Sequence, residues 1–380
     1  MKRKNPYSLI DVNDIDIAQL SQPHIGQAAV VGVDVAKHVH VACVVWPDRR
    51  FERPWRINSP KQVGLFIGKL LELRMHCPLK VAMESSGTYG DALRQALGDA
   101  GIEVVRVSAK AVKDQAETFD GVPSQHDGKD AAIVGTLCLG GHGVPWPLKV
   151  GSRNDQAMRY WVRKLDTASR IKQVWCGKLE SMLARHWPEA SELLEQSGAT
   201  LLNAMSHWGD PRKMAADPQT QQMLAGFGGH YLAEAKIGRV LESARGTIGV
   251  RMNDWAVQEM REIAEAILQE RKRIGVCRRK LKTLSEDYPA IRSQAAAVGL
   301  ITACVLWMCL GDPCNYGSAG AYRKAMGLNL KERSSGLHKG KLSLSKRGAR
   351  LARKWLYFSA LRWMKEPGVK LWMERKKQRD

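Results

Sequence analysis

Several features that mark common protein classes are missing from this sequence. None of its eight cysteines forms a Cys-x-x-Cys pair, which argues against a zinc ribbon. The longest apolar run, residues 298–310, falls short of the roughly 20 residues that a membrane-spanning helix needs. The basic residues near Met1 are not followed by an apolar segment, so no signal peptide is indicated. We therefore expect a cytoplasmic protein, without a membrane partner, whose cysteines are reduced and mostly pack as small hydrophobic residues.

Acidic residues are also scarce. The chain has 59 Lys and Arg against 38 Asp and Glu, a formal net charge of +21, and such an excess favours a polyanionic partner. The last fifty residues alone hold 16 Lys and Arg and 4 Asp and Glu. Large apolar side chains such as Trp355, Phe358 and Trp363 are interleaved with these charges, so this segment is expected to fold rather than remain a solvated tail.

The first 145 residues have the pattern of an α/β domain. Residues 1–27 are polar and aperiodic and are expected to form a loose N-terminal arm. Alternating apolar residues predict strands at 28–35, 39–46, 51–57, 79–83 and 103–107. Helical spacing predicts helices at 59–76, 89–100 and 130–139. Three strands followed by alternating helices and strands is the order of a ribonuclease-H-like domain, which we place at 28–145.

Residues 146–290 are predicted to be helical. Apolar residues recur every seven positions at Met260, Ile267, Ile274, Leu281 and Tyr288, and a companion stripe is interrupted by Glu270. This spacing predicts a long helix in a coiled coil or an antiparallel pair, and the pattern alone leaves open whether its partner belongs to the same chain.

The final region, 291–380, is predicted to be a small, mainly α-helical domain. Gly299 interrupts an apolar helical run at 295–310, and Gly311 closes it. A second helix is predicted at 318–326, followed by a loop rich in Ser, Gly and Lys at 331–344. A basic, aromatic helix is predicted at 345–364, with Ser345 as its N-cap.

Four acidic residues occupy positions typical of metal chemistry. Asp34 and Glu84 end predicted strands, and Asp127 and Asp130 are three apart at a helix start, on one helical face. Carboxylates gathered at one sheet edge repel one another unless cations lie between them, and Mg²⁺ prefers such oxygen ligands. Each residue alone is more often a turn or cap residue, and an alternative role for Asp127 is the N-cap of its helix. The flanking His126 and Lys129 are expected to be phosphate contacts or surface residues.

The motifs around these residues resemble those of DEDD-type insertion-sequence transposases, specifically the insertion-sequence one-ten family of bridge-RNA-guided recombinases. A first block matches the RuvC-like half of that family: 32–37 (GVDVAK), 83–89 (MESSGTY) and 127–131 (DGKDA). A second block matches its serine transposase half: 298–303 (VGLITA), 311–313 (GDP), 322–328 (YRKAMGL) and 334–336 (SSG). The sequence departs from the family at His126, where Thr is common, and at Leu330, where Pro is common.

The resemblance implies an enzyme that cuts and rejoins DNA through a covalent phosphoserine intermediate. It implies Mg²⁺ at Asp34, Glu84, Asp127 and Asp130, and Ser335 as the nucleophile. The implied partners are donor and target DNA, a structured bridge RNA that pairs with both, and further copies of the chain in a dimer or tetramer.

The residues around the serine are compatible with this chemistry, because cations there would bind a scissile phosphate. They are Lys331, Arg333, Lys339 and Lys341. Ser335 is preferred because it directly precedes Gly336, and Ser334 is the alternative. Further phosphate contacts are expected from the basic helix, at Arg347, Arg350, Arg353 and Lys354.

Three other interpretations remain at this stage. The chain could be a Mg²⁺-dependent junction resolvase or nuclease that uses water, in which case Ser335 would only bind DNA. It could be a non-catalytic nucleic-acid-binding protein, although the complete acidic set argues against that. A coiled-coil scaffold would explain the heptads but neither the charge nor the carboxylates.

Overall fold

The computed structural model describes residues 5–84, 87–148, 151–332, 334, 340 and 342–378. The chain divides into two compact units, Met1–Val150 and Gly151–Asp380. No helix within those described ranges is long and apolar enough to cross a membrane.

Five strands form the centre of the sheet in the first unit. They are β2 (Ala29–Val35), β3 (Val39–Val45), β4 (Trp55–Asn58), β5 (Leu79–Glu84) and β6 (Val104–Val107). Across the sheet they run in the order β4-β3-β2-β5-β6, in which β2, β3 and β4 are antiparallel neighbours and β2, β5 and β6 are parallel neighbours. An antiparallel meander joined to two parallel strands on the side of its first strand is the ribonuclease-H-like topology, so the predicted α/β fold is confirmed.

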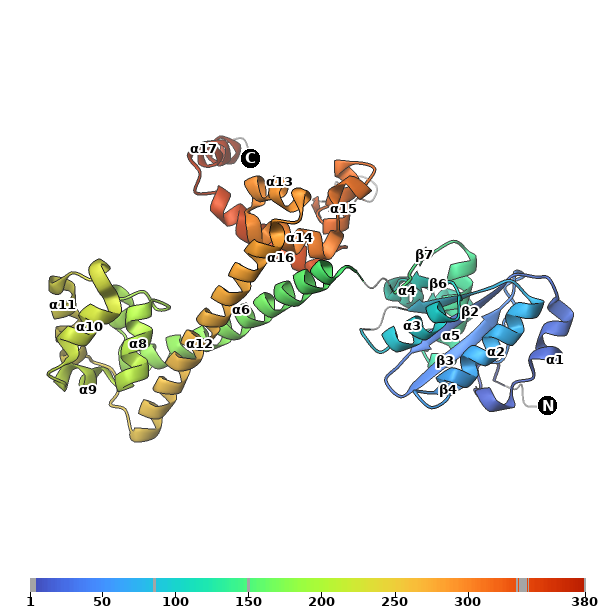
Figure 1. Ribbon diagram of the computed structural model, residues 1–380, viewed down its shortest axis with the longest axis horizontal. Helices are drawn as coiled ribbons and strands as arrows, with labels where there is room; N and C mark the ends of the chain where they lie inside the picture. The colour runs from blue at the N-terminus through green and yellow to red at the C-terminus, as the bar shows by residue number, and fades with distance from the viewer. Residues whose placement is uncertain are drawn as a thin grey trace. The chain divides into compact units, whose positions relative to one another are not determined.

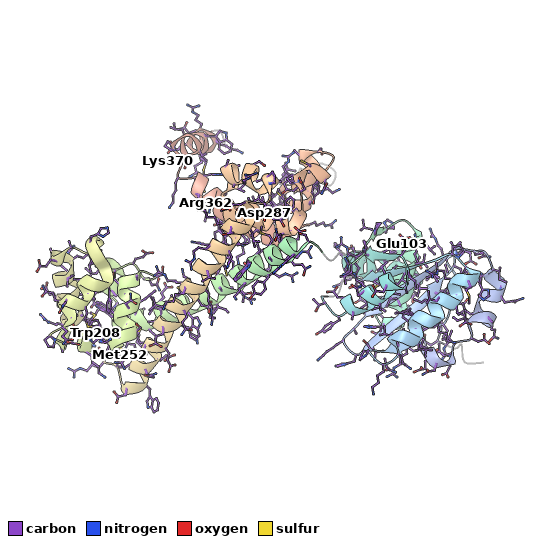
Figure 2. All side chains as sticks on the ribbon, in the orientation of Figure 1. Glu103, Trp208, Met252, Asp287, Arg362 and Lys370 are labelled. Atoms are coloured by element: carbon purple, nitrogen blue, oxygen red, sulfur yellow. The ribbon has the colours of Figure 1, made fainter. Side chains whose placement is uncertain are left out.

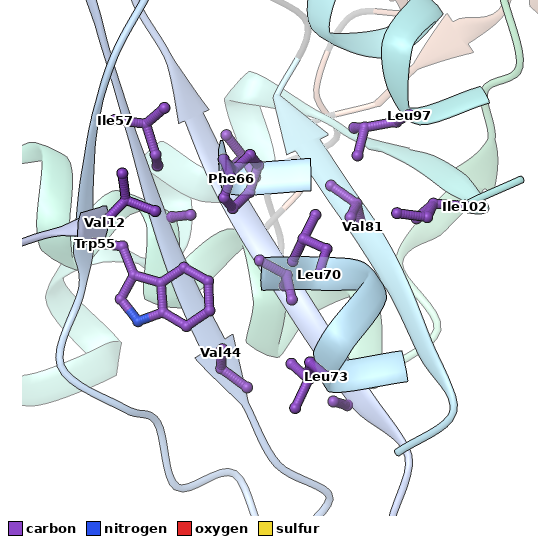
Figure 3. Packing of buried hydrophobic residues seen from close by; sticks show 14 of the residues in the cluster. Val12, Val44, Trp55, Ile57, Phe66, Leu70, Leu73, Val81, Leu97 and Ile102 are labelled. Atoms are coloured by element: carbon purple, nitrogen blue, oxygen red, sulfur yellow. The ribbon is translucent and has the colours of Figure 1, made fainter. Parts of the chain in front are cut away.

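Helices cover both faces of this sheet. On one face, α2 (Val63–His76) and α3 (Asp91–Asp99) pack on the strands through buried side chains that include Phe66, Leu70 and Leu97. In Figure 3, Phe66 and Leu70 lie over the strands of the sheet. The other face carries α4 (Ala109–Asp120) and α5 (Asp127–Leu139). The helix α4 was not among the predicted elements.

The expectation of a loose N-terminal arm is wrong. Residues 5–27 contain a strand, β1 (Ile10–Asp11), that pairs in parallel with β4, and a short helix, α1 (Ile17–Ser21). Val12 and Ile17 are buried in the main core, and Figure 3 shows Val12 beside Trp55. At the other end of the unit, β7 (Gly143–Pro145) extends the sheet by pairing antiparallel with β6.

Two long helices form the axis of the second unit, α6 (Arg153–His186) and α12 (Asp254–Ser285) (Figure 1). Their core contacts show that they are antiparallel. Leu183, late in α6, shares a cluster with Met260, early in α12, whereas Met158 shares a cluster with Leu281. The predicted seven-residue stripe therefore faces α6 of the same chain, and Glu270, which interrupts the companion stripe, is also buried.

A small helical bundle packs at one end of this pair, where Figure 2 labels Trp208 and Met252. Its helices are α7 (Ala190–Leu193), α8 (Ala199–Trp208), α9 (Pro211–Ala216), α10 (Thr220–Gly228) and α11 (Glu234–Gly246).

The C-terminal elements pack at the opposite end, where Figure 2 labels Arg362. They are α13 (Pro289–Val298), α14 (Leu300–Leu310), α15 (Ala319–Met326), β8 (Leu330–Lys331), β9 (Ser343–Leu344), α16 (Arg350–Trp363) and α17 (Pro367–Lys377). Gly299, with φ of 82°, separates α13 from α14 as its position in the sequence indicated. The predicted capping role of Ser345 is wrong, because α16 begins at Arg350 with Ala349 as its N-cap.

Candidate functional site: a carboxylate cluster beside the central strand

Two neighbouring parallel strands place Asp34 and Glu84 at the same edge of the sheet. Val33 of β2 lies opposite Met83 of β5, so each carboxylate follows at the next position along its strand. The preceding residues are buried and apolar, and both acidic residues are half-buried where the strands leave the core. The carboxyl ends of parallel strands are where α/β sheets commonly present functional groups.

A close contact between two glycines places the middle of α5 next to these strands. A Cβ built on Gly32 would lie 2.1 Å from the carbonyl oxygen of Ala131 and 2.4 Å from the backbone nitrogen of Gly135. Likewise, a Cβ on Gly135 would lie 2.5 Å from a methyl group of Val45. Since any larger side chain at Gly32 would push the helix away, this contact fixes α5 against the middle of the sheet.

Electrostatics show that all four carboxylates lie within interaction range. Burial, together with the charges of Asp127, Asp130 and Glu84, raises the pKa of Asp34 to about 6. Burial also raises the pKa of Glu84, with a contribution from Asp130. Chain folding has thus concentrated negative charge in one partly desolvated place, which is costly unless a cation compensates it.

The donor set fits a hard divalent cation. Burial raises the pKa of Asp130, although His126 and Lys129 act in the opposite direction, and its Oδ1 atom is buried without a hydrogen-bond partner in the described part of the chain. An unpaired buried carboxylate oxygen among other carboxylates is suited to Mg²⁺ or a similar ion. Within the described ranges, however, no three His, Cys, Asp or Glu side chains lie close enough to hold one ion. The fold brings the carboxylates into range without forming a complete coordination shell.

Lys129 is where the structure departs most from expectation. Its side chain is fully buried, so it is neither a surface residue nor available to phosphate. Its ammonium lies 2.6 Å from Asp120 Oδ1, and it donates to the carbonyl oxygens of Val122 (2.6 Å) and Ser124 (3.1 Å). Lys129 thereby ties down the loop that leads into Asp127 and Asp130.

The N-terminal arm completes this network. The Tyr7 hydroxyl donates to Asp120 Oδ2 at 2.7 Å, and the Tyr7 ring packs edge-on against His126. Hydrogen bonds from Lys129 and Tyr7 lower the pKa of Asp120 to about 2. His126, rather than Asp127, is the N-cap of α5, and its Nδ1 accepts from the backbone nitrogen of Lys129. One hint was present in the sequence: Lys129 directly precedes Asp130 and the small, apolar run that begins at Ala131.

The serine loop is only partly described. Arg333, Ser335, Lys339 and Lys341 lie outside the described residues. Its base is closed by β8 and β9, in which exposed Lys331 pairs with Ser343. The Ser334 hydroxyl donates to the Glu332 carboxylate and accepts from the backbone nitrogen of Gly340 at 3.1 Å.

The basic residues near α16 fall into two pairs. Arg347 and Arg350 are exposed. In contrast, Arg353 donates to the carbonyl oxygens of Met326 and Gly348, and Lys354 bonds to Asp166 at 2.6 Å. Arg353 and Lys354 therefore make internal contacts that the sequence pattern did not indicate.

A ribonuclease-H-like sheet with acidic residues at the ends of its central strands and on the helix beside them defines a class of enzymes that cut nucleic-acid strands. A family model described as a transposase, for the DEDD domain of IS110 elements, matches residues 31–188. A second, described as the transposase IS116/IS110/IS902 family, matches residues 293–372. The two matches cover more than half of the chain, which belongs to the IS110 family of transposases: enzymes that cleave and join DNA.

Solved structures add little beyond this. Two RuvC structures from Thermus thermophilus, one in complex with a Holliday junction substrate, are each 18% identical to this chain. Each match covers 31% of this chain and 99% of RuvC, with TM-scores of 0.25 and 0.23. At those scores the fold assignment rests on strand order and direction. No curated protein matches the chain.

Proposed function

We propose that Asp34, Glu84, Asp127 and Asp130 hold Mg²⁺ for DNA strand cleavage. The observation that carries this proposal is the placement of Asp34 and Glu84 at neighbouring ends of two paired parallel strands, and the raised pKa of Asp34, to which the other three carboxylates contribute, accords with it. The buried, unpaired Oδ1 of Asp130 supports it. When bound, the metal would supply Lewis acidity at the scissile phosphate. The chain's own part is to hold four oxygen donors on two strand ends and one helix turn.

The metal proposal is tested by single substitutions. Asp34→Asn or Asp130→Asn should abolish strand cleavage, and isothermal titration of the wild-type protein with Mg²⁺ should show binding that both variants lose. Full cleavage by Asp127→Ala would remove Asp127 from the site. Binding of DNA should persist in every variant, because the carboxylates themselves repel phosphate.

We infer that Ser335 is the nucleophile in strand exchange. Its hydroxyl oxygen would attack the scissile phosphorus, and the P–O bond to the departing strand would break. The serine proton would be released to solvent, and the departing oxygen would take one up. The resulting phosphoserine ester conserves the energy of the phosphodiester, so a strand hydroxyl can reverse the step and regenerate serine without another energy source. Exposed Lys331 beside the loop supports a role in phosphate binding.

Ser334 is the second candidate on one observation. Its hydroxyl donates to the Glu332 carboxylate, and such a pairing can activate a serine. Trapping reactions on a nicked substrate and denaturing them separates the two residues. An adduct that disappears in Ser335→Ala and persists in Ser334→Ala supports Ser335, and the reverse pattern supports Ser334. If active wild-type protein gives no adduct, a metal-and-water nuclease replaces the serine mechanism.

We further propose that a structured bridge RNA guides the enzyme and that it acts as a dimer or tetramer. The resemblance to the insertion-sequence recombinases motivates both. The charge distribution supports an RNA partner, since Gly151–Asp380 has 41 Lys and Arg against 22 Asp and Glu. Sequencing RNA that co-purifies with the protein tests the guide, and light scattering with and without that RNA tests the oligomer. Random cellular RNA, or a monomer in both states, would contradict these proposals.

A further inference from the structure

The α6–α12 pair carries a groove that the DNA-cutting chemistry does not use. It has a volume of about 810 Å³, within the range of roughly 300–1,000 Å³ typical of sites that enclose small molecules. One face of α6 and two residues of α12 line most of it. The residues that matter here are Arg159, Tyr160, Arg163, Lys164, Glu270 and Arg273.

The charge in this groove is poorly balanced. Four cations meet a single carboxylate, Glu270, which is buried and already bonded to Arg273. Exposed Arg159 and Arg163 have no hydrogen-bond or ion-pair partner within the described ranges. Arg159, Arg163 and Lys164 lie close together on α6 and repel one another, so the arrangement favours an anionic occupant.

An aromatic ring lies among these cations. Tyr160 is 53% exposed, although tyrosine is large enough to gain considerably from burial. Lys164 donates to its hydroxyl at 2.9 Å, and the ammonium lies 5.2 Å from the ring centroid. An exposed ring flanked by cations is how proteins commonly bind unpaired nucleotides, with bases stacked on the ring and phosphates on the charges.

We propose that this groove binds an unpaired segment of single-stranded nucleic acid. Tyr160 stacks on a base, and Arg159, Arg163 and Arg273 contact the adjoining phosphates. The Glu270 carboxylate, buried where the helical stripe calls for an apolar residue, holds the Arg273 guanidinium at the groove. The inference rests on the nucleic-acid partners of the proposed function and deepens it, because it names a binding site outside the last fifty residues of the chain.

The test measures fluorescence anisotropy of the full-length protein with short labelled RNA and DNA single strands, and with a duplex of the same length. Tyr160→Ala should weaken single-strand binding by about 5-fold to 150-fold, the usual effect of losing one base stack, and leave duplex binding unchanged. Preference between the RNA and DNA strands identifies which of them supplies the segment. An equal loss on the duplex, or no loss on either single strand, overturns the proposal.

A charge variant tests the phosphate contacts independently. Arg159→Gln/Arg163→Gln should lower the slope of log affinity against log salt for single strands by about 1.4, at about 0.7 for each contact. Arg239→Gln/Arg251→Gln removes two exposed arginines outside the groove and is the matched control. Equal slopes in the two double variants would contradict the proposed phosphate contacts in the groove. Ser335→Ala and Asp34→Asn should retain single-strand binding, so failure of the cleavage mechanism is distinguishable from failure of this site.

Discussion

At the scale of single residues, the network around Lys129 positions the proposed catalytic helix. We expect Lys129→Met to lower the free energy of unfolding by about 2–4 kcal/mol, because it leaves Asp120 and two loop carbonyls without their buried partner. Lys110→Met is the matched control, since Lys110 forms an exposed pair with Asp114, and it should change stability by no more than about 0.5 kcal/mol. Urea unfolding followed by circular dichroism measures both. Equal changes in the free energy of unfolding would show that the buried Lys129–Asp120 pair stabilises the fold no more than an exposed pair does.

The acidic cluster should make stability depend on pH and on metal. In the folded chain the pKa of Asp34 is about 6, above its ordinary value of 3.8. Between those values the folded state binds more protons than the unfolded state, so its stability falls as pH rises through this window. Asp34→Asn removes that penalty.

In the presence of a chelator, Asp34→Asn should therefore be more stable than wild type at pH 7.5. The pKa shift of Asp34 limits the gain in free energy of unfolding to about 3 kcal/mol. Solvent screening of a half-buried carboxyl reduces the expected gain to about 1–2 kcal/mol. The difference should shrink strongly by pH 4, where Asp34 is protonated in the folded state and close to half protonated in the unfolded state. Mg²⁺ should stabilise the wild type and not the variant. Urea titrations at the two pH values, with and without Mg²⁺, measure these differences. If Mg²⁺ does not stabilise the wild type more than the variant, the carboxylates bind no metal.

Residue patterns supplied the four candidate carboxylates, but not the contacts that surround them. Asp34, Glu84, Asp127 and Asp130 could be chosen because strand ends and helix faces follow from local periodicity. The burial of Lys129 depends on Asp120, which ends a helix that was not predicted. Asp120 is in turn bonded to Tyr7, which is remote from Lys129 in the sequence. No local pattern encodes such a contact.

At the scale of elements, the apolar stripe in the sequence of α12 correctly predicted a long helix. Ile267 of α12 is fully buried against neighbouring helices. Ile267→Ala should therefore lower the free energy of unfolding by about 3 kcal/mol, because apolar burial is lost and a cavity is left behind. Val276 on the same helix is 38% exposed, and Val276→Ala should change stability by less than about 0.5 kcal/mol. Urea unfolding compares them. Similar values would mean that the stripe does not carry the packing.

The same helix shows where prediction stops at this scale. A seven-residue repeat indicates that one face of α12 is buried, but it does not identify the element that packs on that face. In the structure this element is α6 of the same chain. The order in residues 5–27 was missed for a related reason: β1 is only two residues long and is stabilised by pairing with β4, far along the chain.

At the scale of the whole molecule, charge is divided unequally between the two units. Met1–Val150 has 18 Lys and Arg against 16 Asp and Glu, so almost all of the net charge of +21 belongs to Gly151–Asp380. The nearly neutral unit contains the carboxylate cluster, which must attract cations. The basic unit contains Arg347 and Arg350, two exposed arginines that attract phosphate. Metal binding and nucleic-acid binding are thus expected to be separable by mutation.

A crossed experiment on duplex DNA tests this separation. Arg347→Gln/Arg350→Gln should lower the salt slope of duplex binding by about 1.8, at about 0.9 per phosphate contact, and cleavage should survive when low salt restores binding. Asp34→Asn/Asp130→Asn should leave the slope unchanged and abolish cleavage. Arg353→Gln is the internal comparison, because its guanidinium is bonded to two carbonyl oxygens and its loss should lower stability more than the slope. If the carboxylate variant alters the slope, or the arginine variant stops cleavage at saturating DNA, binding and chemistry are not divided between the two units.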